Sequence, residues 1–184
     1  MLAKYRDELL LNSHNEKSKW TNNYDFYYYK AHNVDKKFES SKDIASKIYP
    51  ILFWKSKKNI QVFTTDEKLL ENPSLINSIT QHIQNKKANI SIILNTEDKK
   101  IQLPTEVTSL LKEYNDKITL RVCEYEWEVP FYYDKDFILF DNKMYIEWNL
   151  NNTTDTEINF NDKEKVGHLK LNFEILRKKL KNIL

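Results

Sequence analysis

The chain has 184 residues, of which 40% are hydrophobic and 30% are charged, and its formal net charge is +2. This length and composition predict a globular domain with a sizeable core and exclude a disordered chain. The near-neutral charge means that binding to nucleic acid would need a local basic patch. A single cysteine, Cys123, excludes an internal disulfide and is expected to be a buried structural residue.

Glycine is scarce, because Gly167 is the only one in the chain. Loops that cradle phosphate groups need glycine, since their backbone must take positive φ angles and approach the ligand closely. A P-loop, a dinucleotide fingerprint, a kinase glycine loop and a G-x-S-x-G nucleophile elbow each need more than one glycine. These classes of enzyme are therefore excluded.

Residues 1–40 are expected to form a helix and an aromatic segment that docks on the core. The early charges argue against a signal peptide, and no apolar run has the length of a membrane span, so we expect a cytoplasmic protein. The aromatic residues could instead form a protein interface or stack on bases. They are Trp20, Tyr24, Phe26, Tyr27, Tyr28 and Tyr29.

Residues 41–122 alternate between helical and strand patterns. Helices are predicted from residue 41, from Pro73 to Asn85 and from Pro104, with strands at 60–63, 90–94 and 117–122. Pro50 predicts either a kink in the first helix or its end near residue 49. This alternation predicts an α/β domain with a mostly parallel mixed sheet and helices on both faces.

The pattern changes after residue 123. Residues 137–141 and 143–148 predict a β-hairpin around Asp141-Asn142, because both residues tolerate left-handed geometry. A short strand is expected at 157–160. Asn161 is expected to cap a long C-terminal helix, whose apolar residues recur every three or four positions. The α/β domain is predicted to span residues 41–184.

Residues 134–149 resemble the signature of the phospholipase D-like superfamily, which is H-x-K, four residues and then Asp, followed by a hairpin partner. Asp134 stands at the position of the His, Asp136 at that of the Lys, and Asp141 at that of the Asp. The order of elements over 42–184 is also similar to one half of such a protein. In this family an active site combines two signature copies, so the resemblance implies a dimer or a second half.

The resemblance also implies a degenerate active site. In the family the His is the nucleophile and the Lys holds the phosphate, and both are aspartates here. A like-charge pair at about 4 Å costs on the order of 4 kcal/mol. We therefore expect no catalytic residues and no cofactor. By analogy of fold, the chain is expected to be an interaction or regulatory module with a protein partner, in a bacterial nucleic-acid-processing or anti-phage defence assembly.

A second interpretation rests on carboxylates in residues 124–141. Glu124, Glu126 and Glu128 would share one face of a strand and could bind a divalent cation through oxygen ligands, as in a metal-dependent nuclease. The alternative is a solvated face of an edge strand. A small phage-type inhibitor protein is a third interpretation that the sequence leaves open.

Three lysines after the first helix of the α/β stretch, Lys55, Lys57 and Lys58, are candidate phosphate contacts. They are the local basic patch that nucleic-acid binding would need.

Overall fold

The computed structural model describes residues 38–40, 42–85, 88–96, 103–124, 135–149 and 152–181. These residues belong to one compact unit, Asp35–Leu184. Their elements follow the order β1 (Phe38–Ser40), α3 (Lys42–Lys55), β2 (Asn59–Thr64), the 3-10 helix η1 (Glu67–Glu71), α4 (Pro73–Asn85), β3 (Asn89–Thr96), α5 (Thr105–Glu113), β4 (Ile118–Glu124), β5 (Lys135–Phe140), β6 (Met144–Asn149), β7 (Asn152–Asn159) and α6 (Lys163–Lys179).

Helix ends follow the local chemistry. Asn72 caps α4 as predicted, since its side-chain oxygen accepts from the N–H groups of Ser74 at 3.0 Å and Leu75 at 3.2 Å. Pro50 lies inside α3, which continues to Lys55, so the helix does not end near residue 49. The cap of α6 is Asp162, which accepts from the N–H of Lys165 at 2.9 Å, and the prediction of Asn161 is wrong by one residue.

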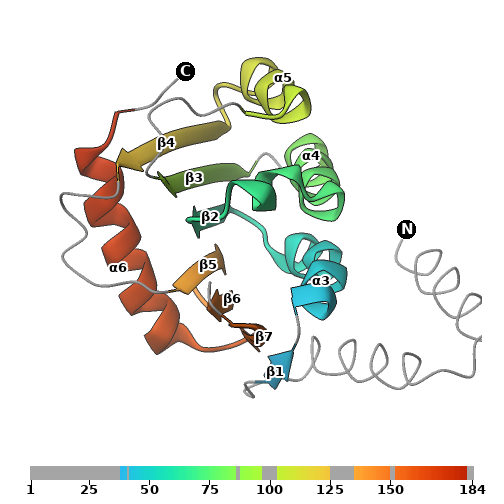
Figure 1. Cartoon of the computed structure of the whole chain (residues 1–184), viewed down its shortest axis with the longest axis vertical. Coiled ribbons are helices and arrows are strands. Elements are labelled where there is room, and N and C mark those ends of the chain that lie inside the picture. The colour runs from blue at the N-terminus through green and yellow to red at the C-terminus, as the bar shows by residue number, and fades with distance from the viewer. Residues whose placement is uncertain are drawn as a thin grey trace, which may run out of the picture. The chain divides into compact units, whose positions relative to one another are not determined.

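The strands form one mixed sheet in the order β1-β7-β6-β5-β2-β3-β4 (Figure 1). In the described residues, β2, β3 and β4 are parallel and every other pairing is antiparallel. The parallel part is therefore smaller than the sequence predicts. Short connections join β5 to β6 and β6 to β7, and strands joined in this way can only be antiparallel neighbours.

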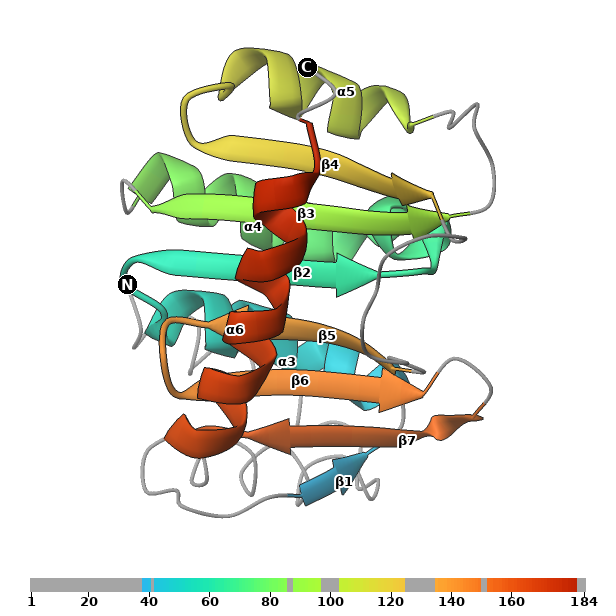
Figure 2. The ribbon, with the colours of Figure 1, turned by 90° about the vertical axis from the view of Figure 1, so that its left-hand side faces the viewer.

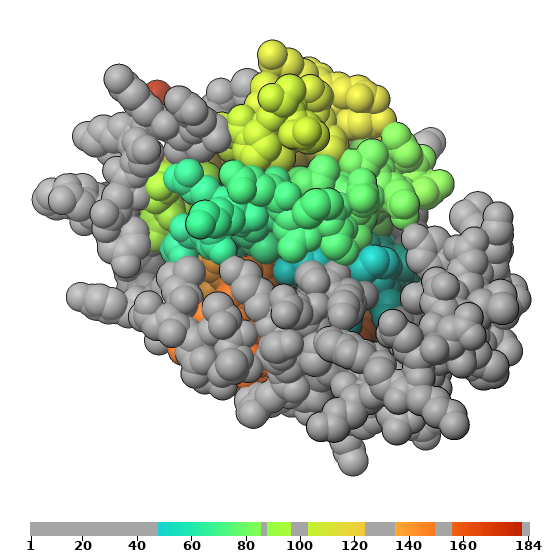
Figure 3. Space-filling view, turned by 45° about the vertical axis from the view of Figure 1, so that its right-hand side comes forward, coloured from blue at the N-terminus to red at the C-terminus, as the bar shows by residue number. Residues whose placement is uncertain are grey.

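Helices cover both faces of the sheet, as predicted. Figure 2 shows that α6 crosses one face, whereas α3, α4 and α5 lie behind the strands on the other. In Figure 3, η1 and α4 (green) form a continuous band next to α5. None of the described helices is long and apolar enough to cross a membrane.

The core under α6 contains the predicted apolar stripe of this helix. Cys123 is buried there, as expected, and Tyr145 contributes its ring. The buried residues of this cluster are Phe63, Ile93, Cys123, Phe137, Leu139, Tyr145, Val166, Leu169, Phe173 and Leu176.

Two edges of the sheet position the candidate site residues. The carboxyl edge is the one where β2, β3 and β4 end, and the amino edge is the one where they begin. Because β5 is antiparallel to β2, it begins at the carboxyl edge and ends at the amino edge.

Candidate functional site

The signature positions do not form one cluster. Asp136, the second residue of β5, lies at the carboxyl edge beside Thr64. Asp141 follows β5 at the amino edge, where its N–H donates to the carbonyl of Asn59 at 2.8 Å. Five residues of extended chain, about 17 Å, separate the two aspartates. Asp134 lies outside the described residues. The two described aspartates therefore act in different places.

Asp136 is a fully buried carboxylate that accepts hydrogen bonds from the end of β2. The Thr64 hydroxyl donates to Oδ2 at 2.5 Å, and the N–H and hydroxyl of Thr65 donate to Oδ1 at 2.9 Å and 3.0 Å. Burial raises the pKa of Asp136, although these hydrogen bonds lower it, and the charge of Asp66 raises it further. The side chain thus fixes the backbone where β2 ends.

Three carboxylates gather at the carboxyl edge around the end of β2. Besides Asp136, they are Asp66, whose side chain caps η1, and Glu67, which accepts from the Thr96 hydroxyl at 2.8 Å. Tyr49 is also buried there, and its pKa is raised by burial and then by the charges of Asp136 and Asp66. A phosphate group here would be repelled by about 4 kcal/mol for each charge at about 4 Å.

A row of polar side chains continues from Asp136 across the sheet. Asp136 stands opposite Trp148 in β6, and Trp148 stands opposite Thr156 in β7, so the three share one face. Among the described residues, Trp148 Nε1 and Thr156 Oγ1 are buried and have no hydrogen-bond partner. A neutral polar group could satisfy such atoms. The sequence gives no sign of this row, because Trp148 has the pattern of a core residue.

Asp141 has a structural role at the amino edge. Its φ angle is 56°, in the left-handed region that the hairpin prediction requires. Its carboxylate accepts from the N–H groups of Lys57, Lys58 and Asn59 at 2.9, 2.9 and 3.1 Å, and from the Ser56 hydroxyl at 3.1 Å. Burial alone would raise the pKa of Asp141, but these hydrogen bonds lower it overall. The residue ties the α3–β2 connection to the hairpin.

The predicted phosphate contacts lie together at this amino edge. Lys57 and Lys58 are exposed, and Lys55 is half-buried in the last turn of α3. Burial lowers the pKa of Lys55, and the charge of Lys143 in the hairpin turn lowers it further. Lys143 therefore belongs to the same cluster, which the sequence did not suggest because 85 or more residues separate it from the other lysines.

Two other predictions fall largely outside the described residues. Glu124 ends β4, but Glu126 and Glu128 are not described. The described residues include no group of three or more His, Cys, Asp or Glu that could hold a metal ion. The aromatic residues from Trp20 to Tyr29 also lie outside the described part. The metal site and the aromatic interface thus stay predictions.

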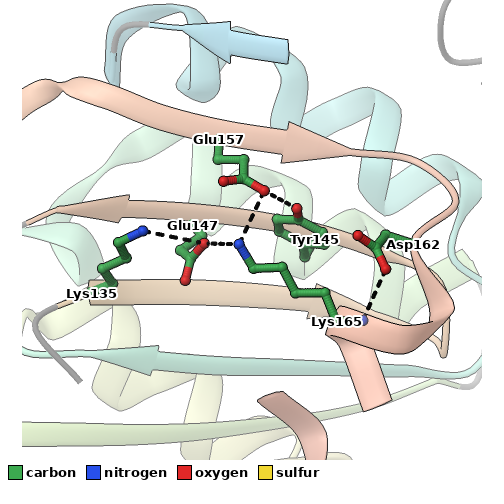
Figure 4. A network of polar contacts seen from close by, with 6 residues as sticks. All are labelled: Lys135, Tyr145, Glu147, Glu157, Asp162 and Lys165. Atoms are coloured by element: carbon green, nitrogen blue, oxygen red, sulfur yellow. Dashed lines mark hydrogen bonds and ion pairs between the residues drawn. The ribbon is translucent and has the colours of Figure 1, made fainter. Parts of the chain in front are cut away.

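A network of charged side chains beneath the start of α6 was not predicted from the sequence (Figure 4). Glu147 in β6 and Glu157 in β7 stand directly opposite each other, and Lys165 of α6 reaches between them, at 2.5 Å and 3.0 Å. Lys135 lies 3.8 Å from Glu147. The Tyr145 hydroxyl donates a hydrogen bond to Glu157. Glu147, the one carboxylate in β6, was the available signal.

The network holds α6 against the sheet. Burial would lower the pKa of Lys165, but the hydrogen bonds and charges of Glu147 and Glu157 raise it overall. Burial and then Glu157 raise the pKa of Tyr145, which therefore keeps its proton and donates. With two carboxylates matched by two ammonium groups, the network is neutral and its groups are engaged with one another.

Comparisons with known proteins give matches in structure only. No family model and no curated protein matches the sequence. The archaeal chromatin protein TrmBL2, which shows a novel mode of DNA binding, is similar with a TM-score of 0.56 and 12% identity over 99% of this chain and 68% of TrmBL2.

Two phospholipase D-like structures are also similar. Nuc from Salmonella typhimurium, a phospholipase D family member, has a TM-score of 0.55 and 9% identity over 80% of this chain and 97% of Nuc. NucT from Helicobacter pylori has a TM-score of 0.51 and 9% identity over 80% of this chain and 99% of NucT. At such low identity the likeness concerns the fold, and the chain has a phospholipase D-like α/β fold with a long C-terminal helix.

Proposed function

We propose that the chain is a non-catalytic phospholipase D-like interaction or regulatory module. Asp136 carries this proposal. At its position the family signature has a lysine, whose cation holds the phosphate. The carboxylate here is buried and accepts three hydrogen bonds from Thr64 and Thr65, so it offers a phosphate neither a cation nor a donor.

Asp134 gives the second support. The family nucleophile at this position is an imidazole, which can be neutral near pH 7. An aspartate there is an anion at the same pH, and it would repel the phosphodiester that it had to attack. Both changes act against the same step, the binding and attack of a phosphate.

The proposed setting is a nucleic-acid-processing assembly, such as a bacterial anti-phage defence system. Its support is the fold shared with TrmBL2, a chromatin protein with a described mode of DNA binding. A protein partner or a second copy of the chain would complete the half-domain.

Hydrolysis assays test the proposal. The purified full chain is incubated with bis(p-nitrophenyl) phosphate in the presence of a chelator, and release of nitrophenolate is measured beside the Asp134→Ala variant. We expect neither protein to release nitrophenolate faster than the buffer alone. Chelator-resistant hydrolysis that Asp134→Ala abolishes would overturn the proposal. Activity that appears only with Mg²⁺ or Mn²⁺, and that Glu126→Gln removes, would establish the metal-dependent nuclease instead.

A further inference from the structure

The amino edge carries a charge opposite to that of the carboxyl edge. Lys57 and Lys58 are exposed in the α3–β2 connection, and Lys143 is exposed in the β5–β6 turn. The Asp141 carboxylate joins the two segments through the backbone N–H groups of Lys57 and Lys58, at 2.9 Å each. The three ammonium groups therefore extend from two turns that are fixed to each other.

Two further lysines extend this cluster over both faces of the sheet. Lys55 belongs to α3 and lies close enough to Lys143 for their charges to interact. Lys170 belongs to α6 and donates to the side-chain oxygen of Asn142 at 2.8 Å, on the other side of the turn. We call these residues the lysine edge, which comprises Lys55, Lys57, Lys58, Lys143 and Lys170.

The charge of the lysine edge is not cancelled by ion pairs. In the part of the chain that the structure describes, none of the salt bridges involves these lysines. Asp141 and Asp162 lie nearby, and both carboxylates are engaged by backbone N–H groups. Among the described residues, these five ammonium groups and two carboxylates leave a net charge of +3. Clustered cations of this kind repel one another and are stabilised by a polyanion.

An exposed aromatic side chain precedes the lysine edge in the sequence. Trp54 directly precedes Lys55 in the last turn of α3, and 43% of it is exposed to solvent. Surfaces that bind single-stranded nucleic acid combine exposed aromatic rings with ammonium groups, because a base stacks on the ring while the phosphates meet the cations. A duplex keeps its bases stacked internally and cannot make the first of these contacts.

We propose that the lysine edge and Trp54 form a binding surface for single-stranded nucleic acid. The inference rests on the proposed nucleic-acid setting and adds the class of ligand and the surface that holds it. This surface lies at the edge opposite Asp136. The strand therefore binds away from Asp136, Asp66 and Glu67 at the carboxyl edge, where a phosphate would be repelled.

Fluorescence anisotropy of a labelled oligothymidylate tests the proposal at a series of KCl concentrations. Five phosphate contacts, one for each lysine of the lysine edge, predict that log K falls with log[KCl] with a slope of about −3.5. Lys57→Gln/Lys58→Gln removes two contacts and makes this slope shallower by about 1.4. Trp54→Ala leaves the slope unchanged and weakens binding by about 5-fold to 150-fold, the range measured for loss of one stacked base.

Matched controls separate a specific surface from general charge. Lys112→Gln/Lys178→Gln makes the same charge change at exposed lysines of α5 and α6, and Leu171→Ala truncates the other exposed large hydrophobic residue among those described. Both are expected to bind like the wild type. Circular dichroism checks that each variant is folded.

Three results would overturn the inference. The first is equal loss of affinity in the two lysine pairs, and the second is a duplex bound as tightly as the single strand with no effect of Trp54→Ala. The third is binding to phosphatidylserine vesicles without binding to the oligonucleotide, which would indicate a membrane surface. None of them bears on the hydrolysis assays, so the non-catalytic assignment is judged separately.

Discussion

Replacing Lys165 by methionine removes the cation that lies between two opposed carboxylates. The side chains of Glu147 and Glu157 are 6% and 13% exposed and stand directly opposite each other in β6 and β7. Like charges in this position destabilise a sheet. Methionine keeps an unbranched apolar stem in place of the lysine stem, so the substitution isolates the role of the charge.

The size of the effect follows from the exposure of the groups. Removing one partner of a buried ion pair costs about 3–5 kcal/mol, because the other charge is left uncompensated. Lys165 is 31% exposed and Lys135 remains 3.8 Å from Glu147, so water and the second lysine reduce the cost. We expect Lys165→Met to lower the free energy of unfolding by about 2–3 kcal/mol. The matched control Lys135→Met should lower it by about 0.5 kcal/mol.

Urea unfolding followed by circular dichroism measures these differences. The double variant Glu147→Gln/Lys165→Met should recover at least about 1 kcal/mol of the loss, since it also removes one of the two carboxylates. Because the pKa of Lys165 is raised, its stabilisation is fully present below the unfolded pKa of about 10.4 and is lost as the pH rises through the folded pKa. A Lys165→Met variant no less stable than Lys135→Met would refute this account of the network.

Three further predictions use the same unfolding measurement. Asp141→Asn should lower the free energy of unfolding by about 1–3 kcal/mol at pH 7. Because the pKa of Asp141 is lowered, its stabilisation is present above the unfolded pKa of about 3.9 and is lost as the pH falls through the folded pKa. The stabilities of wild type and variant should therefore converge in acid. The pKa of Asp136 is raised, so its ionisation lowers the stability of the fold above about pH 3.9. The wild type should therefore gain stability relative to Asp136→Asn as the pH falls through the folded pKa. A difference in stability between the two proteins that does not change with pH would contradict the presence of a buried charge. Phe173→Ala should lower the free energy of unfolding by about 3–5 kcal/mol, because Phe173 lies fully buried on the inner face of α6 and its truncation leaves a cavity. A loss below about 1 kcal/mol would show that this core is loosely packed.

Much of the fold could be predicted because the spacing of apolar residues along the chain reflects which side chains are buried. The stripe of α6 predicted a buried face, and Val166, Leu169, Phe173 and Leu176 all lie in the core under that helix. The end of a helix is harder to locate, since Asn161 and Asp162 are both good caps and only the backbone geometry chooses between them. The sequence also could not show that Pro50 would be accommodated within α3.

The candidate site could be predicted only in part. Asp136 is the second residue of β5 and Asp141 directly follows that strand, but spacing along a strand does not tell which threonines or backbone amides each carboxylate meets. The pairing of Lys165 with Glu147 joins a helix to a strand 18 residues away, and only the packing of α6 on the sheet brings the two together.

We propose that the chain binds single-stranded nucleic acid without cutting it, and one labelled oligonucleotide reports on both binding and cleavage. The full chain is incubated with it to equilibrium and for many hours beyond, with chelator or with Mg²⁺. A native gel then measures binding, and a denaturing gel measures the length of the strand. We predict a shifted complex that contains only full-length oligonucleotide under both conditions. Shortened products that persist with chelator and disappear in Asp134→Ala would contradict the account.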